Sequence, residues 1–206
     1  LSQVYEEIRK QGGICISDEV QTGFGRLGDA FWGFEHHHVI PDIVVIGKPM
    51  GNGHPMGAVI TTDAIAHSFE TGMEFFSSFG GNPVSCEIGM AVLDVIENEN
   101  LQRNALVIGN QLKRDLSTLQ KRYPIIGDIR GSGLFLGIEL VTNINTMEPA
   151  TGHAKKVKEE LKKAGILIGT DGPFDNVLKI KPPLCFNEQN ANYFIKKLTN
   201  ILNNLK

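Results

Sequence analysis

The sequence predicts an α/β fold in which a mainly parallel sheet is followed by a small C-terminal α+β domain. Residues 14–16 and 43–46 form short apolar runs without alternation, a pattern typical of parallel strands covered by helices on both faces. The connection between the two runs is long enough for a crossover between parallel strands. From residue 125 onwards, glycine-punctuated strands and helices replace this pattern, which indicates a second domain.

The first predicted domain spans residues 1–110. Apolar residues at helical spacing predict a helix over residues 1–10, which ends before a Gly-Gly pair. After the two apolar strands, residues 58–60 predict a third, reached through the turn-rich segment 51–55, which we expect to be functional. Pro83 suits a first helical turn, and the apolar stripe behind it predicts helices that link the two domains.

The second predicted domain spans residues 111–206. Residues 125–140 predict a pair of strands, and residues 154–164 predict a helix rich in Lys and Glu. Two further strands are predicted over residues 166–168 and 177–180. A closing helix is indicated by apolar residues at a period near 3.6: Ala191, Phe194, Ile195, Leu198, Ile201, Leu202 and Leu205.

Composition limits the class of partner. The 206 residues are 41% hydrophobic, enough to bury a sizeable core, and their formal net charge is -3. We find neither a Lys/Arg-dense face nor an apolar stretch long enough for a bilayer, so we expect no nucleic-acid partner and no membrane. The expected ligand is a small molecule.

Cysteine and histidine usage argues against a metal site. Cys15, Cys86 and Cys185 are far apart in the sequence, so we expect no disulfide framework and a reducing, cytoplasmic location. The run 36–38 is three consecutive histidines, whose side chains cannot all face one ion on regular structure. We therefore expect a solvated loop there and no metal.

Asp18 is the first candidate for chemistry. It follows a predicted buried strand, and open α/β sheets bind ligands at the carboxyl ends of their strands. The alternative is that the Asp18 carboxylate only caps the next turn.

Lys48 is the second candidate. It follows the strand 43–46, so its amine and the Asp18 carboxylate leave two strand ends that could converge on one ligand. A desolvated lysine amine loses part of its preference for the charged form, and the neutral amine attacks carbonyl groups. The alternative is an ordinary solvated surface lysine. The pair suits pyridoxal phosphate, which acts as an electron sink while a carboxylate holds a proton on its ring nitrogen.

Two serines form a weaker candidate for phosphate binding. Ser77 and Ser78 lie beside Gly80 and Gly81, just before the helix that Pro83 begins. Hydroxyls and backbone N–H groups ahead of a helix are a common setting for a phosphate group.

Five motifs together resemble the class III aminotransferases, a family of fold type I pyridoxal-phosphate enzymes. They occur in the order and approximate spacing of that family and span nearly the whole chain: Asp18-Glu19-Val20-Gln21-Thr22-Gly23-Phe24-Gly25-Arg26, Gly47-Lys48, Phe79-Gly80-Gly81-Asn82-Pro83, Arg130-Gly131-Ser132-Gly133-Leu134 and Lys181-Pro182-Pro183-Leu184. The resemblance implies that residues 1–110 are the C-terminal part of a cofactor-binding large domain.

The resemblance also implies roles for individual residues. Asp18 would bond the pyridine nitrogen of pyridoxal phosphate, Gln21 would lie near the 3-oxygen of its ring, and Lys48 would form the Schiff base and carry the proton. Ser78 stands where the family usually has a phosphate-binding Thr. That hydroxyl serves the neighbouring subunit in the family, so a homodimer with shared active sites is implied.

Lys179 departs from the pattern of amino-acid-directed members, which often carry an Arg for the substrate carboxylate. A bidentate fork is lost there. The stretch from Thr170 through Lys179 to Phe186 resembles the branch of phospho-lyases that release phosphate from ethanolamine phosphate or phosphohydroxylysine. Lys179 is thus a weak candidate for substrate binding.

Three functions remain open at this point. The first is an aminotransferase acting on a primary amine, and the second is a phospho-lyase using the same Lys48 and Asp18. The third is a structural or dimerising portion without activity of its own. A start without Met, running within a dozen residues into a strand, leads us to expect a piece of a longer polypeptide.

Overall fold

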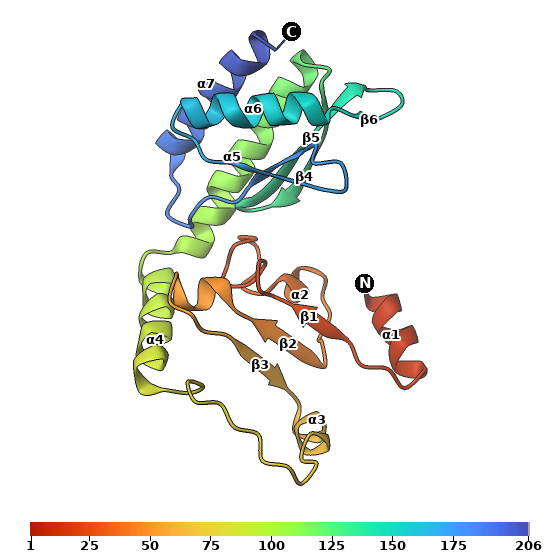
Figure 1. Cartoon of the computed structure of the whole chain (residues 1–206), viewed down its shortest axis with the longest axis vertical. Coiled ribbons are helices and arrows are strands. Elements are labelled where there is room, and N and C mark those ends of the chain that lie inside the picture. The colour runs from red at the N-terminus through yellow and green to blue at the C-terminus, as the bar shows by residue number, and fades with distance from the viewer. Residues whose placement is uncertain (206) are drawn as a thin grey trace. The chain divides into compact units, whose positions relative to one another are not determined.

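The computed structural model describes residues 1–205, which form two compact units. The first unit runs from Leu1 to Gln102 and the second begins at Arg103 (Figure 1). The predicted boundary after residue 110 lies inside helix α5 (Leu101–Arg122). Each unit has its own sheet and is described separately.

The first unit contains a three-stranded mixed sheet. Strands β1 (Ile16–Asp18) and β2 (Ile43–Ile46) pair in parallel, and β3 (Ala58–Thr61) pairs antiparallel to β2. The α/β class is confirmed, and these three strands make one parallel pair and one antiparallel pair. Residues 47–57 hold only a short 3-10 helix, η1 (Lys48–Gly51), and turns, so the chain reverses without the crossover that a parallel neighbour requires.

One face of this sheet is partly exposed. Ile16 on β1 is 56% exposed and Val59 on β3 is 65% exposed, so no helix of the described chain covers these positions. Cys15, just before β1, is buried with Tyr5 and Val39 in a small apolar cluster. The expectation of helices over both faces is therefore wrong for the described residues.

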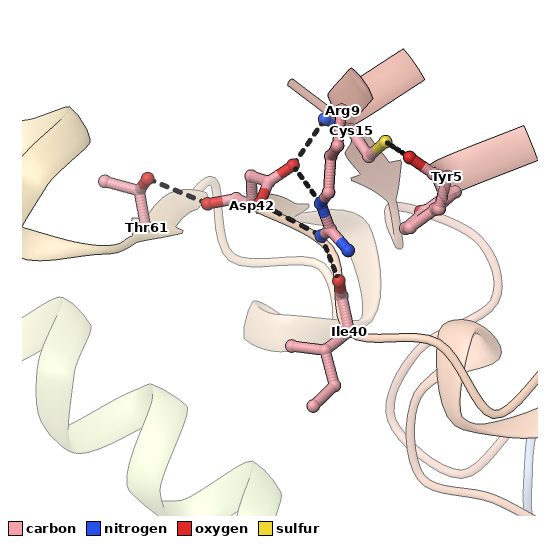
Figure 2. Close-up of polar contacts among 6 residues, drawn as sticks. All are labelled: Tyr5, Arg9, Cys15, Ile40, Asp42 and Thr61. Atoms are coloured by element: carbon pink, nitrogen blue, oxygen red, sulfur yellow. Dashed lines mark hydrogen bonds and ion pairs between the residues drawn. The ribbon is translucent and has the colours of Figure 1, made fainter. Parts of the chain in front are cut away.

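Helix α1 (Ser2–Lys10) is tied to the sheet by one carboxylate (Figure 2). Arg9 donates to Asp42 from Nη2 at 2.9 Å and from Nε at 3.2 Å, and the backbone N–H of Cys15 donates to the same carboxylate at 2.7 Å. The hydroxyl of Thr61 donates to the Asp42 carbonyl oxygen at 2.9 Å. Asp42 thus joins the helix to the start of β1 and to the end of β3.

Four further helices complete the first unit or leave it. They are α2 (Gly33–His36), α3 (Asp63–Ser68), α4 (Pro83–Asn98) and the start of α5. Pro83 occupies the first turn of α4 as predicted, and the Asn82 side chain accepts a hydrogen bond from the Ser85 N–H. Ile96 is the one buried residue of α4 in the described chain, and the rest of its apolar stripe is half-buried or exposed.

The second unit contains an antiparallel sheet with the order β4-β5-β8-β7, and β6 pairs with β5. In chain order its elements are β4 (Ile126–Ser132), β5 (Phe135–Asn143), β6 (Glu148–Pro149), α6 (Thr151–Lys163), β7 (Gly169–Asp171), β8 (Val177–Ile180) and α7 (Glu188–Asn203). The small α+β arrangement is as predicted. Strand β8 occupies the predicted residues.

The predicted strand 166–168 lies too early in the chain. The N–H of Ile166 donates to the Leu161 carbonyl, and Gly165, at φ +80°, donates to the Lys162 carbonyl. These bonds close the end of α6, so the residues after Gly165 complete the helix cap before β7 begins at Gly169.

The core of the second unit lies between one face of the sheet and helices α5, α6 and α7. Leu112, Leu116, Ile138, Leu161 and Leu178 are among its fully buried side chains. Of the helices among residues 1–205, none is long and apolar enough to cross a bilayer.

Candidate functional site

The two main candidates follow adjacent parallel strands. Asp18 is the last residue of β1 and pairs in register with Val45, while Lys48 follows the end of β2 at Ile46 by two residues. Because β1 and β2 are parallel, both side chains follow carboxyl ends at the same edge of the sheet, as the sequence predicts. Both residues are exposed.

Asp18 also caps the turn that follows it. One carboxylate oxygen, Oδ1, accepts the Val20 N–H at 3.1 Å. The N–H of Glu19 donates to the Val45 carbonyl at 2.8 Å, which extends the pairing of the strands by one residue. The turn cap considered as an alternative is therefore present, and it holds the Asp18 carboxylate at the sheet edge.

The backbone of Lys48 has an unusual conformation. Its φ of +24° is positive, which is uncommon for a residue with a side chain, and it begins η1. The preceding Gly47 has a φ of −172° and a ψ of −144°. The backbone of Gly57 packs closely against the end of β2, two residues before Lys48. A Cβ added to Gly57 would lie 3.2 Å from the Ile46 carbonyl oxygen. Strained backbone of this kind persists where the surroundings fix it and is concentrated at functional sites.

Glu19 is a buried carboxylate that the sequence reasoning did not single out. It is 1% exposed and accepts four hydrogen bonds. The hydroxyls of Ser17 and Thr22 donate to it at 2.9 and 2.6 Å, and the N–H groups of Gly33 and Phe34 donate at 2.8 and 2.9 Å. Glu19 therefore fixes the loop that runs from β1 to α2. The flanking hydroxyls were the only local signal, since the two N–H donors lie 14 and 15 residues away.

Aromatic rings pack within this loop. Trp32 lies edge-on to Phe24 and Phe31, with ring centroids 5.2 and 4.9 Å apart. An added Cβ on Gly23 would lie 2.8 Å from the Trp32 ring, so a side chain there would collide with the indole. Gln21, the candidate for the cofactor's 3-oxygen, is exposed on the turn just before this packed segment.

The loop after Lys48 is attached to the start of α4. His54 Nε2 lies 2.7 Å from the Ser85 hydroxyl, and the Asn82 side-chain amide donates to the same hydroxyl at 2.9 Å. His54 therefore has a hydrogen-bonding role between this loop and the first turn of α4. The contact restrains the turn-rich segment 51–55.

Ser78 lies outside the sheet. It is exposed, within the irregular segment that joins α3 to α4 (Figure 1). The neighbouring Ser77 hydroxyl accepts the Gly80 N–H at 3.1 Å. Phe75, Phe76 and Phe79 in the same segment are each at least 75% exposed.

Lys179 belongs to the second unit. It lies on β8, and its Nζ is 2.5 Å from a carboxylate oxygen of Asp171 on β7. Hydrogen bonding from Lys179 and from the Gly172 N–H holds the pKa of the Asp171 carboxyl below its ordinary value.

The family model described as aminotransferase class-III matches residues 1–202. The chain is 52% identical over 194 residues to alanine–glyoxylate aminotransferase 2-like of Drosophila melanogaster, and 43% identical over 197 residues to mitochondrial alanine–glyoxylate aminotransferase 2 of Homo sapiens. These alignments cover 93% and 95% of this chain, but 39% and 38% of the relatives.

Two solved structures are also similar. A phospholyase from Arthrobacter in complex with phosphoethanolamine has a TM-score of 0.96 and 40% identity, covering 100% of this chain and 49% of the other. An amine transaminase from an uncultivated Pseudomonas species, in its PLP-bound form, has a TM-score of 0.88 and 31% identity, covering 100% and 48%. The chain thus spans about half of these solved chains and about two fifths of the curated relatives.

Proposed function

Because the chain belongs to the class III aminotransferases, we propose that it forms part of a pyridoxal-phosphate-dependent aminotransferase that acts on a primary amine. The observation that carries this proposal is the position of Asp18 and Lys48 after adjacent parallel strands. A carboxylate and a lysine amine at one sheet edge are the two groups that this cofactor's chemistry requires.

The cofactor would supply an electron sink for the bond that breaks at the amine-bearing carbon of the substrate. The residues present fit such a group. Asp18 has a second carboxylate oxygen besides the one that accepts the Val20 N–H, and it can hold a proton on a ring nitrogen. Lys48 is exposed and has an amine that can bond an aldehyde carbon.

Lys48 would also move the proton. The Lys48 amine would be the base that takes the proton from the amine-bearing carbon of the substrate and the acid that later gives it back. Glu19 supports this chemistry indirectly, because its four hydrogen bonds fix the loop that begins at Asp18. Gln21 is proposed to contact the ring's 3-oxygen.

Ser78 is proposed to bind the cofactor phosphate in a homodimer with shared active sites. The proposal rests on the family resemblance and on the exposure of the segment that carries Ser78. The exposed phenylalanines of that segment are side chains that a second subunit would cover.

A phospho-lyase is the second candidate. The observations that favour it are Lys179, where amino-acid-directed relatives often have Arg, and the similarity to the Arthrobacter phospholyase. The two activities differ in product, because a phospho-lyase releases inorganic phosphate. A third candidate, a structural or dimerising portion without catalysis, predicts neither product.

We propose the cytoplasm as the location, because Cys15, Cys86 and Cys185 are free thiols that suit a reducing compartment. The human relative is mitochondrial by name. Fractionation of cells that express the tagged protein distinguishes the two compartments.

The test is covalent trapping of the cofactor. Pyridoxal phosphate is added, the adduct is reduced with borohydride, and the modified peptide is identified by mass spectrometry. We expect one adduct at Lys48, its loss in Lys48→Ala, and its retention in the matched variant Lys155→Ala, an exposed lysine of α6. Adducts spread evenly over exposed lysines contradict the proposal. A screen of amines for keto-acid or phosphate release then separates the candidates.

A further inference from the structure

A pocket of about 380 Å³ lies against the sheet of the second unit. One face of this sheet packs on the helices, and Leu136, Ile138, Leu178 and Ile180 point into that core. Residues alternate between faces along a strand, so their neighbours lie on the opposite face. The pocket is on this opposite face, and the residues that matter for its chemistry are Arg130, Gly137, Asp171 and Lys179.

Two cations of the pocket lie in one row across the strands. Arg130 on β4 pairs with Gly137 on β5, and Gly137 pairs with Lys179 on β8. Side chains of directly paired residues lie on the same face. The backbones of Arg130 and Lys179 are therefore separated by two strand spacings, about 10 Å.

Gly137 leaves the space between the two cations open. It has no side chain, and an added Cβ would lie 3.1 Å from Cγ1 of Val177 and 4.0 Å from Cγ of Arg130. A larger residue at this position would fill the floor of the pocket. The row is thus a positively charged side chain, a gap and a second positively charged side chain.

Both cations form ion pairs with carboxylates in this structure. Arg130 donates through Nη1 to Asp128 at 2.8 Å and to Glu139 at 2.5 Å, whereas the single carboxylate bonded to Lys179 in the described chain is that of Asp171. The two sides of the row differ in this respect, because Arg130 is held by two carboxylates and Lys179 by one.

Asp171 is the partner that is most easily displaced. Its side chain is 60% exposed, compared with 23% for Glu139. It ends the three-residue edge strand β7, and the next residue, Gly172, has a φ of +83°. A short edge strand followed by a glycine can move its last side chain at low cost.

We propose that the row Arg130–Gly137–Lys179 is a binding site for a phosphate-sized dianion, and that Asp171 occupies Lys179 when the dianion is absent. A ligand carboxylate that displaces Asp171 from Lys179 replaces one singly charged anion by another, so the net gain in binding free energy is small. A phosphate dianion brings a second charge and three oxygens, enough to bridge Lys179 and the remaining donors of Arg130. Asp171 thereby selects phosphate over carboxylate.

Lys181 adds to the positive charge at this site. Its Nζ lies 5.1 Å from the centre of the Phe135 ring, which also lines the pocket. Its charge contributes to the lowered pKa of the Asp171 carboxyl. This proposal deepens the substrate-binding role suggested above for Lys179. It rests on the proposed function only where it identifies the dianion as part of the substrate.

The test is a titration of the 206-residue chain, without cofactor, with sodium phosphate at pH 8 and separately with sodium acetate. Amide NMR signals report the site of binding. We expect phosphate to shift the signals of Gly137 and Gly172, and acetate to bind at least about tenfold more weakly, the effect of one charge-assisted hydrogen bond. Equal binding of the two anions overturns the selection by Asp171.

Four variants locate the site. Lys179→Gln is expected to weaken phosphate binding about tenfold or more, and Gly137→Ala to weaken it without any change of charge. Asp171→Asn is expected to tighten phosphate binding and to raise acetate affinity more. The matched control is Lys163→Gln, which removes the same charge from an exposed helical ion pair with Glu160.

The variants also supply the outcomes that would overturn the proposal. If Lys163→Gln weakens binding as much as Lys179→Gln, phosphate responds only to net charge. If Asp171→Asn changes neither affinity, Asp171 does not compete for Lys179. Thermal unfolding of each variant confirms that the fold is retained. Cofactor trapping at Lys48 is a separate readout, so failure here and failure of the proposed function are distinguishable.

Discussion

Gly109 of helix α5 packs directly against the backbone of Gly133, in the turn between β4 and β5. A Cβ added to Gly109 would lie 2.2 Å from the Gly133 carbonyl oxygen, closer than van der Waals contact permits. Backbone cannot move aside as a flexible side chain can. The absence of a side chain at Gly109 thus allows the helix to reach the sheet of the second unit.

We predict that Gly109→Ala destabilises the chain by about 2–4 kcal/mol, because the turn must shift away from the helix. Urea unfolding followed by circular dichroism measures the change. Gly152→Ala is the control, since Gly152 lies in helix α6 with no atom within 4 Å of an added Cβ. It should stabilise by about 0.5–1 kcal/mol through helix propensity. A Gly109 variant as stable as the Gly152 variant contradicts the packing.

Glu19→Gln tests the buried carboxylate. The amide has one oxygen where the carboxylate has two, so its NH₂ group faces N–H and O–H donors, and we expect a loss of about 2–4 kcal/mol. Trp32, the single tryptophan, lies in the loop that Glu19 fixes, and its fluorescence should shift. Glu7→Gln, a change at an exposed helical residue, serves as the control. An unchanged Trp32 signal would disprove the role of Glu19.

Asp42 provides a pH-dependent prediction. Hydrogen bonds from Arg9 and from the Cys15 N–H hold the pKa of its carboxyl below the ordinary value. A lowered folded-state pKa stabilises the fold above the unfolded pKa of about 3.9, and this contribution disappears as the pH falls through the folded value. Asp42→Asn should therefore be less stable than the native chain at pH 7, and the difference should shrink below about pH 4. Urea unfolding at several pH values measures it. A difference independent of pH would exclude an ionic origin.

Asn82→Ala removes the side-chain cap of α4. The Asn82 side chain accepts the Ser85 N–H at 2.9 Å and donates to the Ser85 hydroxyl, so its loss should cost about 1–2 kcal/mol. Hydrogen exchange should rise at the first turn of α4 and in segment 51–55, since His54 also contacts the Ser85 hydroxyl. Exchange that rises in α4 alone would show that the loop does not depend on this cap.

Local patterns predicted much of the fold correctly. The strand at β2 was predicted residue for residue, and so was β8, because each is a short apolar or alternating run between turn residues. The placement of Asp18 and Lys48 followed from the same reasoning, since parallel strands bring their carboxyl ends to one edge.

The parts that were missed depend on contacts distant in the sequence. The antiparallel direction of β3 depends on how residues 47–57 turn, which composition alone does not fix. Glu19 gains its role from backbone donors at Gly33 and Phe34. The row of Arg130, Gly137 and Lys179 exists only through strand register, which joins residues from three separate strands.

Asp18 and Glu19 are adjacent in the sequence but have different roles in the structure. Successive side chains of an extended chain point in opposite directions, so one acid is exposed at the sheet edge and the other is enclosed by its four donors. An engineer can therefore vary position 18 to alter reactivity without unfolding the protein. A substitution at position 19 would disturb the loop that holds the reacting groups without changing those groups themselves. Tolerance to mutation should therefore differ sharply between these two adjacent positions.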